Sequence, residues 1–347
     1  MKSKNLSEKI LRSVKSKGFK YIELPSVIEA NHIVQRSGEN FRKFMFSFTD
    51  INGKELCLRP DLTIASCLRY LEGNFKGKEK IFYSGQAYRK VESKRDKIIR
   101  NQVGFEILGS KDEKNDDKEI INTSIKILQD LNFSSGTLTI GNIEIFNLLI
   151  SKLDIPKRWK LRLSRHFWRE KYFNDLLKRL ETNADIDPTI VEIDKKRYLD
   201  LLNKNPETMI AGRSVGEILK RFDTKIKDPR QAKRGNKVSK IIKSFLKISC
   251  PINKAAMELN KFFKKNKINL VVDQRYFPIS SNKLSKLNVK FSTSFGRHLE
   301  YYSGMVFKID VKSKSTTIKC AGGRYDRLIS DLGSKKQVPA VGAAFNL

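Results

Sequence analysis

The chain has 347 residues, of which 39% are hydrophobic, and a formal net charge of +32 at pH 7. This length and composition predict a globular protein of two or three domain-sized units. They exclude a membrane-spanning helix, because no run approaches the roughly 20 apolar residues that such a helix needs. The N-terminal segment is rich in Lys and lacks an apolar region, so we expect no signal peptide and a cytoplasmic location.

The positive charge favours contact with phosphates, which makes nucleic-acid binding one possible function class. However, Lys outnumbers Arg by 48 to 22, and the basic residues are spread from Lys2 to Lys336. Such a distribution is typical of a compositional bias rather than of one concentrated binding surface. We therefore interpret the charge as general composition and keep a nucleic-acid-binding module as an alternative.

The first third of the chain predicts a sheet with interspersed helices. Leu6, Ile10 and Val14 have the spacing of an amphipathic helix that ends near Gly18. The Asn52-Gly53 pair is a strong hairpin signal. The expected helices are residues 6–17, 60–71 and 120–131. The expected strands are residues 21–25, 44–50, 55–58, 80–89, 101–108 and 137–140.

Residues 145–267 change in character, with helical periodicity, dense Lys and no pattern of strand, turn and strand. We expect helices here at residues 164–180 and 238–247. Strand patterns return at residues 268–273, 305–311 and 316–320. The simplest organisation is α/β of the α+β type: a β-rich body formed by residues 1–144 and 268–347, interrupted by a helical, Lys-rich insertion at residues 145–267.

Polar residues gather in five short strings. Asp61 and Thr63 stand at an expected helix start, where backbone N–H groups point outward. Gln102, Gly104 and Glu106 alternate along a strand and therefore share one face. Each string alone is typical of a solvated sheet face. Together with Gln86–Arg89 and the Arg- and Tyr-containing strings at residues 295–307 and 322–326, they indicate a pocket for a small, charged, partly planar ligand.

Other chemistry is not indicated by the sequence. The cysteines are Cys57, Cys67, Cys250 and Cys320. They are dispersed without CxxC spacing, so we expect buried thiols and neither a zinc site nor a disulfide. There is no phosphate-binding loop of the GxxxxGK[ST] type, no dinucleotide fingerprint and no recognisable Ser-His-Asp set. We predict no cofactor and no metal.

Taken in order, these strings resemble the histidyl-tRNA synthetase lineage of class II aminoacyl-tRNA synthetase folds. Residues 59–63 are similar to its Arg-Pro-Glu-Gly-Thr segment, and residues 88–89 and 102–106 are similar to its second motif. Residues 297–302 and 322–326 resemble its two histidine-specific strings. The resemblance covers residues 1 to about 145 and 268–347. It implies an antiparallel sheet flanked by helices and a homodimer.

The resemblance also implies a histidine pocket. Asp61, Thr63 and Gln102 would contact the α-amino group, because an ammonium requires a carboxylate and neutral acceptors. Arg297 would face the ligand carboxylate. Arg89 would lie nearby, where the synthetases place the α-phosphate.

The imidazole of the ligand would be held by three further residues. Glu106, Tyr302 and Tyr325 would bond both ring nitrogens within an aromatic wall. Asp61 replaces the glutamate of the synthetases and is shorter by one methylene.

Other departures concern catalysis. The sequence reaches Asn346-Leu347 without the arginine of the third motif that clamps ATP phosphates in the synthetases, so we expect neither this clamp nor an anticodon-binding domain. Ile98 and Ile99 stand where the synthetases have polar groups. Loss of phosphate clamps removes the charge stabilisation on which nucleotidyl transfer depends.

With these departures the chain resembles the family of ATP phosphoribosyltransferase regulatory subunits, synthetase paralogues that work with a short-form catalytic subunit in the first step of histidine biosynthesis. The strings at residues 294–302 and 211–217 are similar to strings of this family. The resemblance implies a non-catalytic subunit of a hetero-oligomer, needed for partner activity and for feedback sensing of histidine. The alternatives are an ATP-dependent histidine-activating enzyme, a tRNA-binding module, and a scaffold with a vestigial pocket.

Overall fold

The computed structural model describes residues 3–37, 39–73, 77–91, 97–133, 135–182, 188–210, 212–227, 232–279, 287–296, 301–312 and 317–347. They form two compact units. The first unit comprises residues 1–144, 249–258 and 272–347, and the second comprises residues 145–248 and 259–271. Residues 249–258, which the sequence placed in the insertion, thus belong to the first unit.

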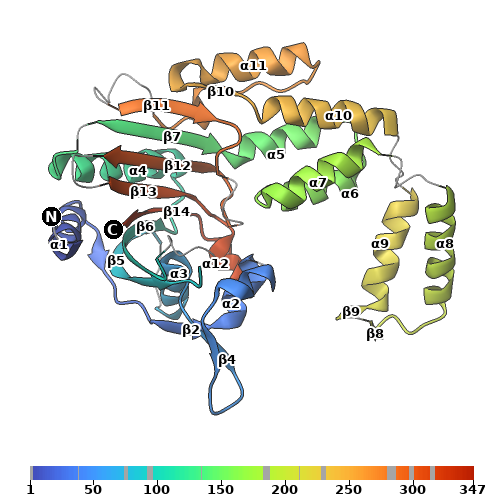
Figure 1. Ribbon diagram of the computed structural model, residues 1–347, viewed down its shortest axis with the longest axis horizontal. Helices are drawn as coiled ribbons and strands as arrows, with labels where there is room; N and C mark the ends of the chain where they lie inside the picture. The colour runs from blue at the N-terminus through green and yellow to red at the C-terminus, as the bar shows by residue number, and fades with distance from the viewer. Residues whose placement is uncertain are drawn as a thin grey trace. The chain divides into compact units, whose positions relative to one another are not determined.

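A large sheet forms the centre of the first unit (Figure 1). Within the described residues its strand order is β1-β5-β6-β14-β13-β12-β7-β11-β10. The central run from β5 to β7 is antiparallel throughout, whereas β1 pairs with β5 and β11 pairs with β7 in parallel. The strands are β1 (Lys20–Tyr21), β5 (Glu79–Tyr88), β6 (Ile99–Leu108), β7 (Gly136–Asn142), β10 (Ser249–Pro251), β11 (Leu287–Ser292), β12 (Met305–Lys312), β13 (Thr317–Arg324) and β14 (Ala340–Asn346).

Helices cover both faces of this sheet. On one face α1 (Ser3–Lys15) and α4 (Glu113–Asp130) pack together and contact β6, where Phe19 and Phe345 contact Phe105 with ring centroids 5.4 and 6.2 Å away. On the other face lie α3 (Leu62–Glu72) and α12 (Leu328–Asp331), which contact each other. The second face positions the polar strings, because the Glu106 side chain on β6 accepts a hydrogen bond from Thr63 of α3.

A small sheet and short helices complete the first unit. The strands of the small sheet are β2 (Val27–Glu29), β3 (Ser47–Thr49) and β4 (Glu55–Leu58). The short helices are α2 (Ala30–Ser37) and the 3-10 helices at Glu39–Phe44, Ile252–Lys254 and Gln274–Tyr276. The predicted hairpin around Asn52-Gly53 is confirmed as β3 and β4. Asp50 Oδ1 accepts the N–H groups of Asn52 and Lys54, and Gly53 adopts a φ of 77°, which glycine tolerates.

The second unit is helical. Its helices are α5 (Ile143–Lys152, from residue 145 onward), α6 (Lys157–Arg165), α7 (Glu170–Glu181), α8 (Pro188–Leu202), α9 (Val215–Lys227), α10 (Ala232–Phe245) and the last part of α11 (Ala255–Lys265). Phe146 forms the centre of its core, stacked on Phe167 at 3.8 Å and within 6.3 Å of Phe173 and Phe245. In the part of the chain that the structure describes, no helix is long and apolar enough to cross a membrane.

Several predicted elements need correction. The helix expected at residues 164–180 is confirmed only from Glu170 onward, as α7, because α6 ends at Arg165 and the turn that follows inserts Phe167 into the core. The strand expected at residues 268–273 is wrong. Lys267 adopts a φ of 55° and Ile268 donates to Phe263 O, which closes the end of α11, and Val271 is 75% exposed.

The remaining differences are shorter. The strand expected at residues 21–25 is reduced to β1, and the helix expected at residues 120–131 is the second half of the longer α4. Strands β10 and β11 and the two-residue strands β8 (Met209–Ile210) and β9 (Arg213–Ser214) were not predicted. The helices at residues 6–17 and 60–71 and the strands at 80–89, 101–108, 137–140, 305–311 and 316–320 are confirmed.

Candidate functional site

The polar face of the sheet contains a buried carboxylate. Glu106 on β6 is 1% exposed. Its Oε1 accepts the Tyr83 hydroxyl at 2.5 Å and the Thr63 hydroxyl at 3.3 Å, and its Oε2 accepts the Tyr325 hydroxyl at 2.6 Å. These hydroxyls come from β5, the first turn of α3 and the segment after β13. The carboxylate therefore joins three parts of the unit, and its Oε2, which accepts only the Tyr325 hydroxyl among the described residues, still has a lone pair for a ligand.

Glycines make room for this network. Gly342 on β14 pairs with Glu106 on β6, and a Cβ atom at this position would overlap Glu106 Oε2. Gly104 pairs with Tyr83, and a Cβ atom there would overlap the tyrosine ring. Glycine therefore occupies the strand positions where a larger residue would collide with the side chains of the polar network.

Burial gives Glu106 an unusual proton affinity. It raises the pKa of Glu106 from its ordinary value of 4.5 to about 7, although hydrogen bonds from Tyr325 and Tyr83 act in the opposite direction. The nearby Asp61 carboxylate contributes to this rise. A carboxyl group that titrates near neutrality suits recognition of an imidazole, whose own pKa lies in the same range.

This pKa shift predicts a pH-dependent contribution to stability. Because the folded pKa is raised, Glu106 stabilises the fold fully below about pH 4.5 and loses this contribution as pH rises through about 7. We expect the parent to lose stability relative to Glu106→Gln across this window. The difference between their free energies of unfolding, parent minus variant, should fall by on the order of 3 kcal/mol. Urea unfolding of both proteins at a series of pH values measures the difference. A difference that does not change with pH would contradict the shift.

The start of α3 brings Asp61 to the same region. Asp61 caps the helix, with Oδ1 accepting the Ile64 N–H at 3.1 Å, and its Oδ2 lies 3.7 Å from Arg89 Nη2. Arg89 also donates from Nε to Pro60 O at 2.8 Å, and its guanidinium lies 5.5 Å from the Phe41 ring centroid. The predicted helix start at this string is confirmed, and Arg89 is oriented toward it.

Gln102 lies farther along the same face of β6. It is directly opposite Asn346 on β14, and its side-chain amide donates to Asn346 Oδ1 at 2.7 Å. Asn346 therefore orients the Gln102 amide, and the Gln102 carbonyl oxygen remains available as an acceptor.

An aromatic wall borders the Glu106 network. Tyr302 contacts Tyr301 with ring centroids 4.9 Å apart, and Tyr301 contacts Tyr325 at 5.9 Å. Burial raises the pKa of Tyr302, and the carboxylates of Asp61 and Glu106 raise it further. The hydroxyl of Tyr302 therefore stays protonated near these carboxylates. Arg297 lies outside the described residues.

The structure thus assembles Asp61, Thr63, Glu106, Tyr302 and Tyr325 in one region. Sequence reasoning missed Tyr83, which donates to Glu106, and gave no role to Tyr301. The signal for Tyr83 is its position opposite Gly104, which can be recognised only when the strand register is known. Arg59, in the same string as Asp61, is structural, because it donates to the carbonyl oxygens of residues 24, 25 and 86.

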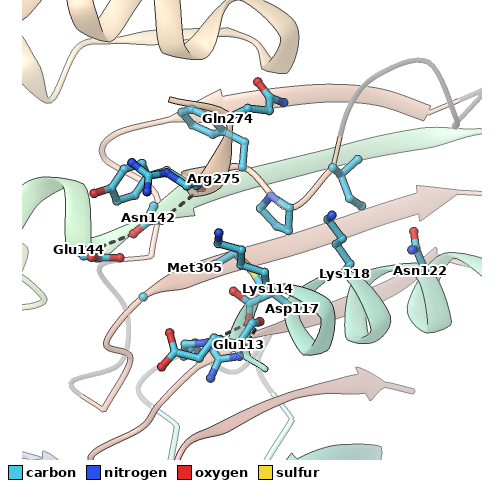
Figure 2. Close-up of a pocket in the computed structure, with 16 residues that line it drawn as sticks. Glu113, Lys114, Asp117, Lys118, Asn122, Asn142, Glu144, Gln274, Arg275 and Met305 are labelled. Carbon is cyan, nitrogen blue, oxygen red and sulfur yellow. Dashed lines mark hydrogen bonds and ion pairs between the residues drawn. The ribbon is translucent and has the colours of Figure 1, made fainter. Parts of the chain in front are cut away.

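Arg324, next to Tyr325, faces away from this region. It is 4% exposed and donates to Asp117 Oδ1, Asp326 Oδ1 and Glu113 O, each at 2.9 Å. Arg324 forms part of the wall of a pocket of about 710 Å³. Figure 2 shows this pocket, with Lys114, Lys118 and Asn122 from α4 on one side and Gln274 and Arg275 on the other. None of the described residues that we predicted for histidine lines it.

The cysteines and possible metal ligands give little further chemistry. Cys57, Cys67 and Cys320 are buried thiols, as predicted, whereas Cys250 is only partly buried. All of them are unpaired. Among the described side chains there is no cluster of three or more His, Cys, Asp or Glu residues that could hold a metal ion.

A sheet whose central strands are antiparallel, with helices on both faces and a polar network on one of them, is the architecture expected of a class II aminoacyl-tRNA synthetase fold. The family model described as Histidyl-tRNA synthetase matches residues 1–347. The chain belongs to this family. The predicted fold class is therefore confirmed.

Curated relatives extend over nearly the whole chain. It is 28% identical over 338 residues to the ATP phosphoribosyltransferase regulatory subunit of Agrobacterium fabrum, covering 92% of this chain and 89% of that protein. It is 28% identical over 350 residues to the protein of the same name from Allorhizobium ampelinum, covering 96% and 93%.

Solved structures share the fold. An ATP phosphoribosyltransferase regulatory subunit/histidyl-tRNA synthetase from Bacillus halodurans superposes with a TM-score of 0.57 at 20% identity, covering 99% of this chain and 76% of that one. Histidyl-tRNA synthetase from Nostoc superposes with a TM-score of 0.58 at 16% identity, covering 98% and 68%.

Proposed function

We propose that the chain is a non-catalytic regulatory subunit of an ATP phosphoribosyltransferase, and that it binds histidine as a feedback signal. The observation that carries this proposal is the similarity to relatives of that name over 92% of the chain and 89% of the relative. Its partner is a short-form catalytic subunit, and the chain forms a homodimer within the hetero-oligomer. The site around Glu106 supports the ligand assignment.

Histidine recognition follows from the chemistry of the site. The carboxylate of Glu106 accepts an imidazole N–H, and the hydroxyl of Tyr302 or Tyr325 bonds the second ring nitrogen. Asp61, Thr63 and Gln102 contact the α-amino group. Arg297 pairs with the ligand carboxylate. Arg89, which lies 3.7 Å from Asp61, limits the negative charge around the ammonium site.

Regulation follows from linkage between ligand binding and assembly. If histidine binds one arrangement of the complex more tightly than another, it shifts the population toward that arrangement, and the catalytic partner changes histidine affinity by the same factor. The Glu106 network provides a physical route, because it joins β5, α3 and the segment after β13 through one carboxylate.

Reconstitution with the partner tests the proposed function. The chain is co-expressed with a short-form phosphoribosyltransferase from the same source, and the purified material is sized and assayed with and without histidine. We expect a stable complex that is more active than the catalytic subunit alone and is inhibited by histidine. Absence of any complex, or a complex that does not respond to histidine, would contradict the regulatory proposal.

The role of Arg297 can be tested by calorimetric titration with histidine. We expect Arg297→Ala to weaken binding by about 2 to 5 kcal/mol, because removal of the guanidinium leaves a desolvated ligand carboxylate unpaired. Arg69→Ala is the matched control, since Arg69 is exposed and pairs with Glu72 on the outside of α3. Equal affinity of Arg297→Ala and the parent would show that the residue does not face the ligand carboxylate.

The second candidate function is ATP-dependent activation of histidine, favoured by the family to which the chain belongs. This activity predicts histidine-dependent exchange of pyrophosphate into ATP. We expect none from the chain alone, because Ile98 and Ile99 occupy exposed positions before and at the start of β6, where the synthetases carry polar groups. Robust exchange by the purified chain would replace the regulatory proposal with this one.

A further inference from the structure

The helical second unit has a strongly basic pocket of about 670 Å³. Its wall combines residues of α6 with residues of α9, both labelled in Figure 1. The cations in the wall are Arg158, Arg162, Arg165, Lys220 and Arg221, and one acidic residue, Glu217, accompanies them. The positive charges therefore outnumber the negative charge within a concave site, where field lines are concentrated.

General composition does not explain this pocket. Lys outnumbers Arg by about two to one in the whole chain, but the pocket has four Arg and one Lys. The planar guanidinium of Arg matches two oxygens of a phosphate group, whereas Lys acts as a point charge. The excess of Arg therefore points to a ligand with phosphate oxygens rather than to a solvated surface.

Aromatic contacts hold part of the basic set in place. The guanidinium carbons of Arg158 and Arg162 lie 5.9 and 5.6 Å from the ring centroid of Trp159, a side chain that is 1% exposed. Arg162 Nη2 also donates to the Tyr172 hydroxyl at 3.1 Å. Side chains fixed in this way lose less conformational entropy when an anion binds.

His166 also lines the pocket, and the positive charges around it affect its protonation. Burial, together with the charges of nearby arginines, lowers the pKa of His166 to about 4; these arginines are Arg169, Arg165 and Arg162. His166 is therefore neutral at pH 7 and can act as either donor or acceptor toward a ligand.

We propose that this pocket binds a small polyphosphate anion, such as pyrophosphate or the triphosphate group of a nucleotide. The volume suits a small molecule, since ligand pockets are typically about 300 to 1,000 Å³. The cations converge from two helices on one concave site, whereas a nucleic-acid backbone needs a basic track along a groove. The proposal concerns the second unit and is independent of histidine binding.

Tryptophan fluorescence provides a local measurement, because the chain has two tryptophans and both lie in this unit, Trp159 in the pocket wall and Trp168 beside Arg169. The full chain is titrated with pyrophosphate, ATP, AMP and sulfate at constant ionic strength. We expect a saturable change with pyrophosphate and ATP, and affinity for them about tenfold or more above that for AMP or sulfate.

Three variants distinguish the pocket from general charge. Arg162→Gln and Arg221→Gln remove one cation from each helix and should each weaken pyrophosphate binding about tenfold. Arg197→Gln removes an exposed arginine of α8 outside the pocket and should leave affinity unchanged. Thermal unfolding checks that each variant remains folded, and Arg221→Gln serves if loss of the Trp159 contact destabilises Arg162→Gln.

Three results would overturn the proposal. The first is no saturable signal with pyrophosphate or ATP in the parent chain. The second is equal weakening by Arg197→Gln and by the pocket variants, which would identify nonspecific charge. The third is saturable binding of an RNA oligonucleotide that depends on Arg162 and Arg221 and is not displaced by pyrophosphate, which would make the site a nucleic-acid contact.

Discussion

Gly342→Ala is expected to abolish histidine binding and to lower the free energy of unfolding by about 3 kcal/mol or more. The new methyl group would overlap Glu106 Oε2, and it would also approach Phe105 O at 2.9 Å. Neither neighbour can easily move, because Glu106 is held by Tyr83 and Tyr325, and Phe105 is part of a paired central strand. The carboxylate must therefore leave its tyrosine partners. Chemical unfolding and calorimetric titration with histidine measure the two effects.

Gly216→Ala is a matched control for this substitution. A Cβ atom on Gly216 would meet Pro206 O at 3.5 Å, an ordinary contact, and alanine is the better helix former in α9. We expect its stability to stay within about 1 kcal/mol of the parent. A double-mutant cycle with Glu106→Ala isolates the cause, since removal of the carboxylate should reduce the cost of Gly342→Ala. Parental stability and histidine affinity in Gly342→Ala would show that the site is not arranged as described.

Much of the site could be predicted because its elements have strong local signals. Asp61 is a helix-capping residue one position before α3, and the alternation along β6 places Gln102, Gly104 and Glu106 on one face without knowledge of the partner strands. The hairpin at Gly53 depends on neighbouring residues, since Asp50 Oδ1 accepts the N–H groups of Asn52 and Lys54. Such features are encoded locally, so the sequence alone reveals them.

Features that depend on contacts between distant segments could not be predicted. Tyr83 donates to Glu106 because β5 and β6 pair in a particular register, and Gly342 is required because β14 lies against β6. The break between α6 and α7 has a similar origin, since Phe167 interrupts a helical pattern in order to stack on Phe146. Tertiary packing overrides local propensity at these positions.

Arg324 also depends on distant partners, and its sequence string indicated a ligand contact rather than a buried ion pair. In the structure Nε and Nη2 lie 2.9 and 2.7 Å from Asp117 Oδ1, and Nη1 donates to Asp326 Oδ1. Asp326 in turn accepts the Ala340 N–H at 3.0 Å, and Tyr325 donates its N–H to Ala340 O. The arginine thus orients the segment that carries Tyr325 into the Glu106 network.

Arg324→Met should therefore lower the free energy of unfolding by about 3 to 5 kcal/mol at pH 8, because it leaves two largely buried carboxylates without their cation. Burial already raises the pKa of Asp117 to about 7, and the charge of Arg324 opposes that rise. Without the arginine this carboxyl holds its proton to higher pH, so the cost should be smaller at pH 5 than at pH 8. Urea unfolding at both pH values measures this change.

Two further variants identify the cause of this effect. Arg69→Met breaks an exposed pair with Glu72 and should change stability by less than about 1 kcal/mol at either pH. Adding Asp117→Asn to Arg324→Met should recover part of the loss at pH 8, because the uncompensated charge is removed. If Arg324→Met costs the same at both pH values and Asp117→Asn recovers nothing, then the buried charge of Asp117 is not what Arg324 neutralises, and its effect comes from its hydrogen bonds to Glu113 O and Asp326.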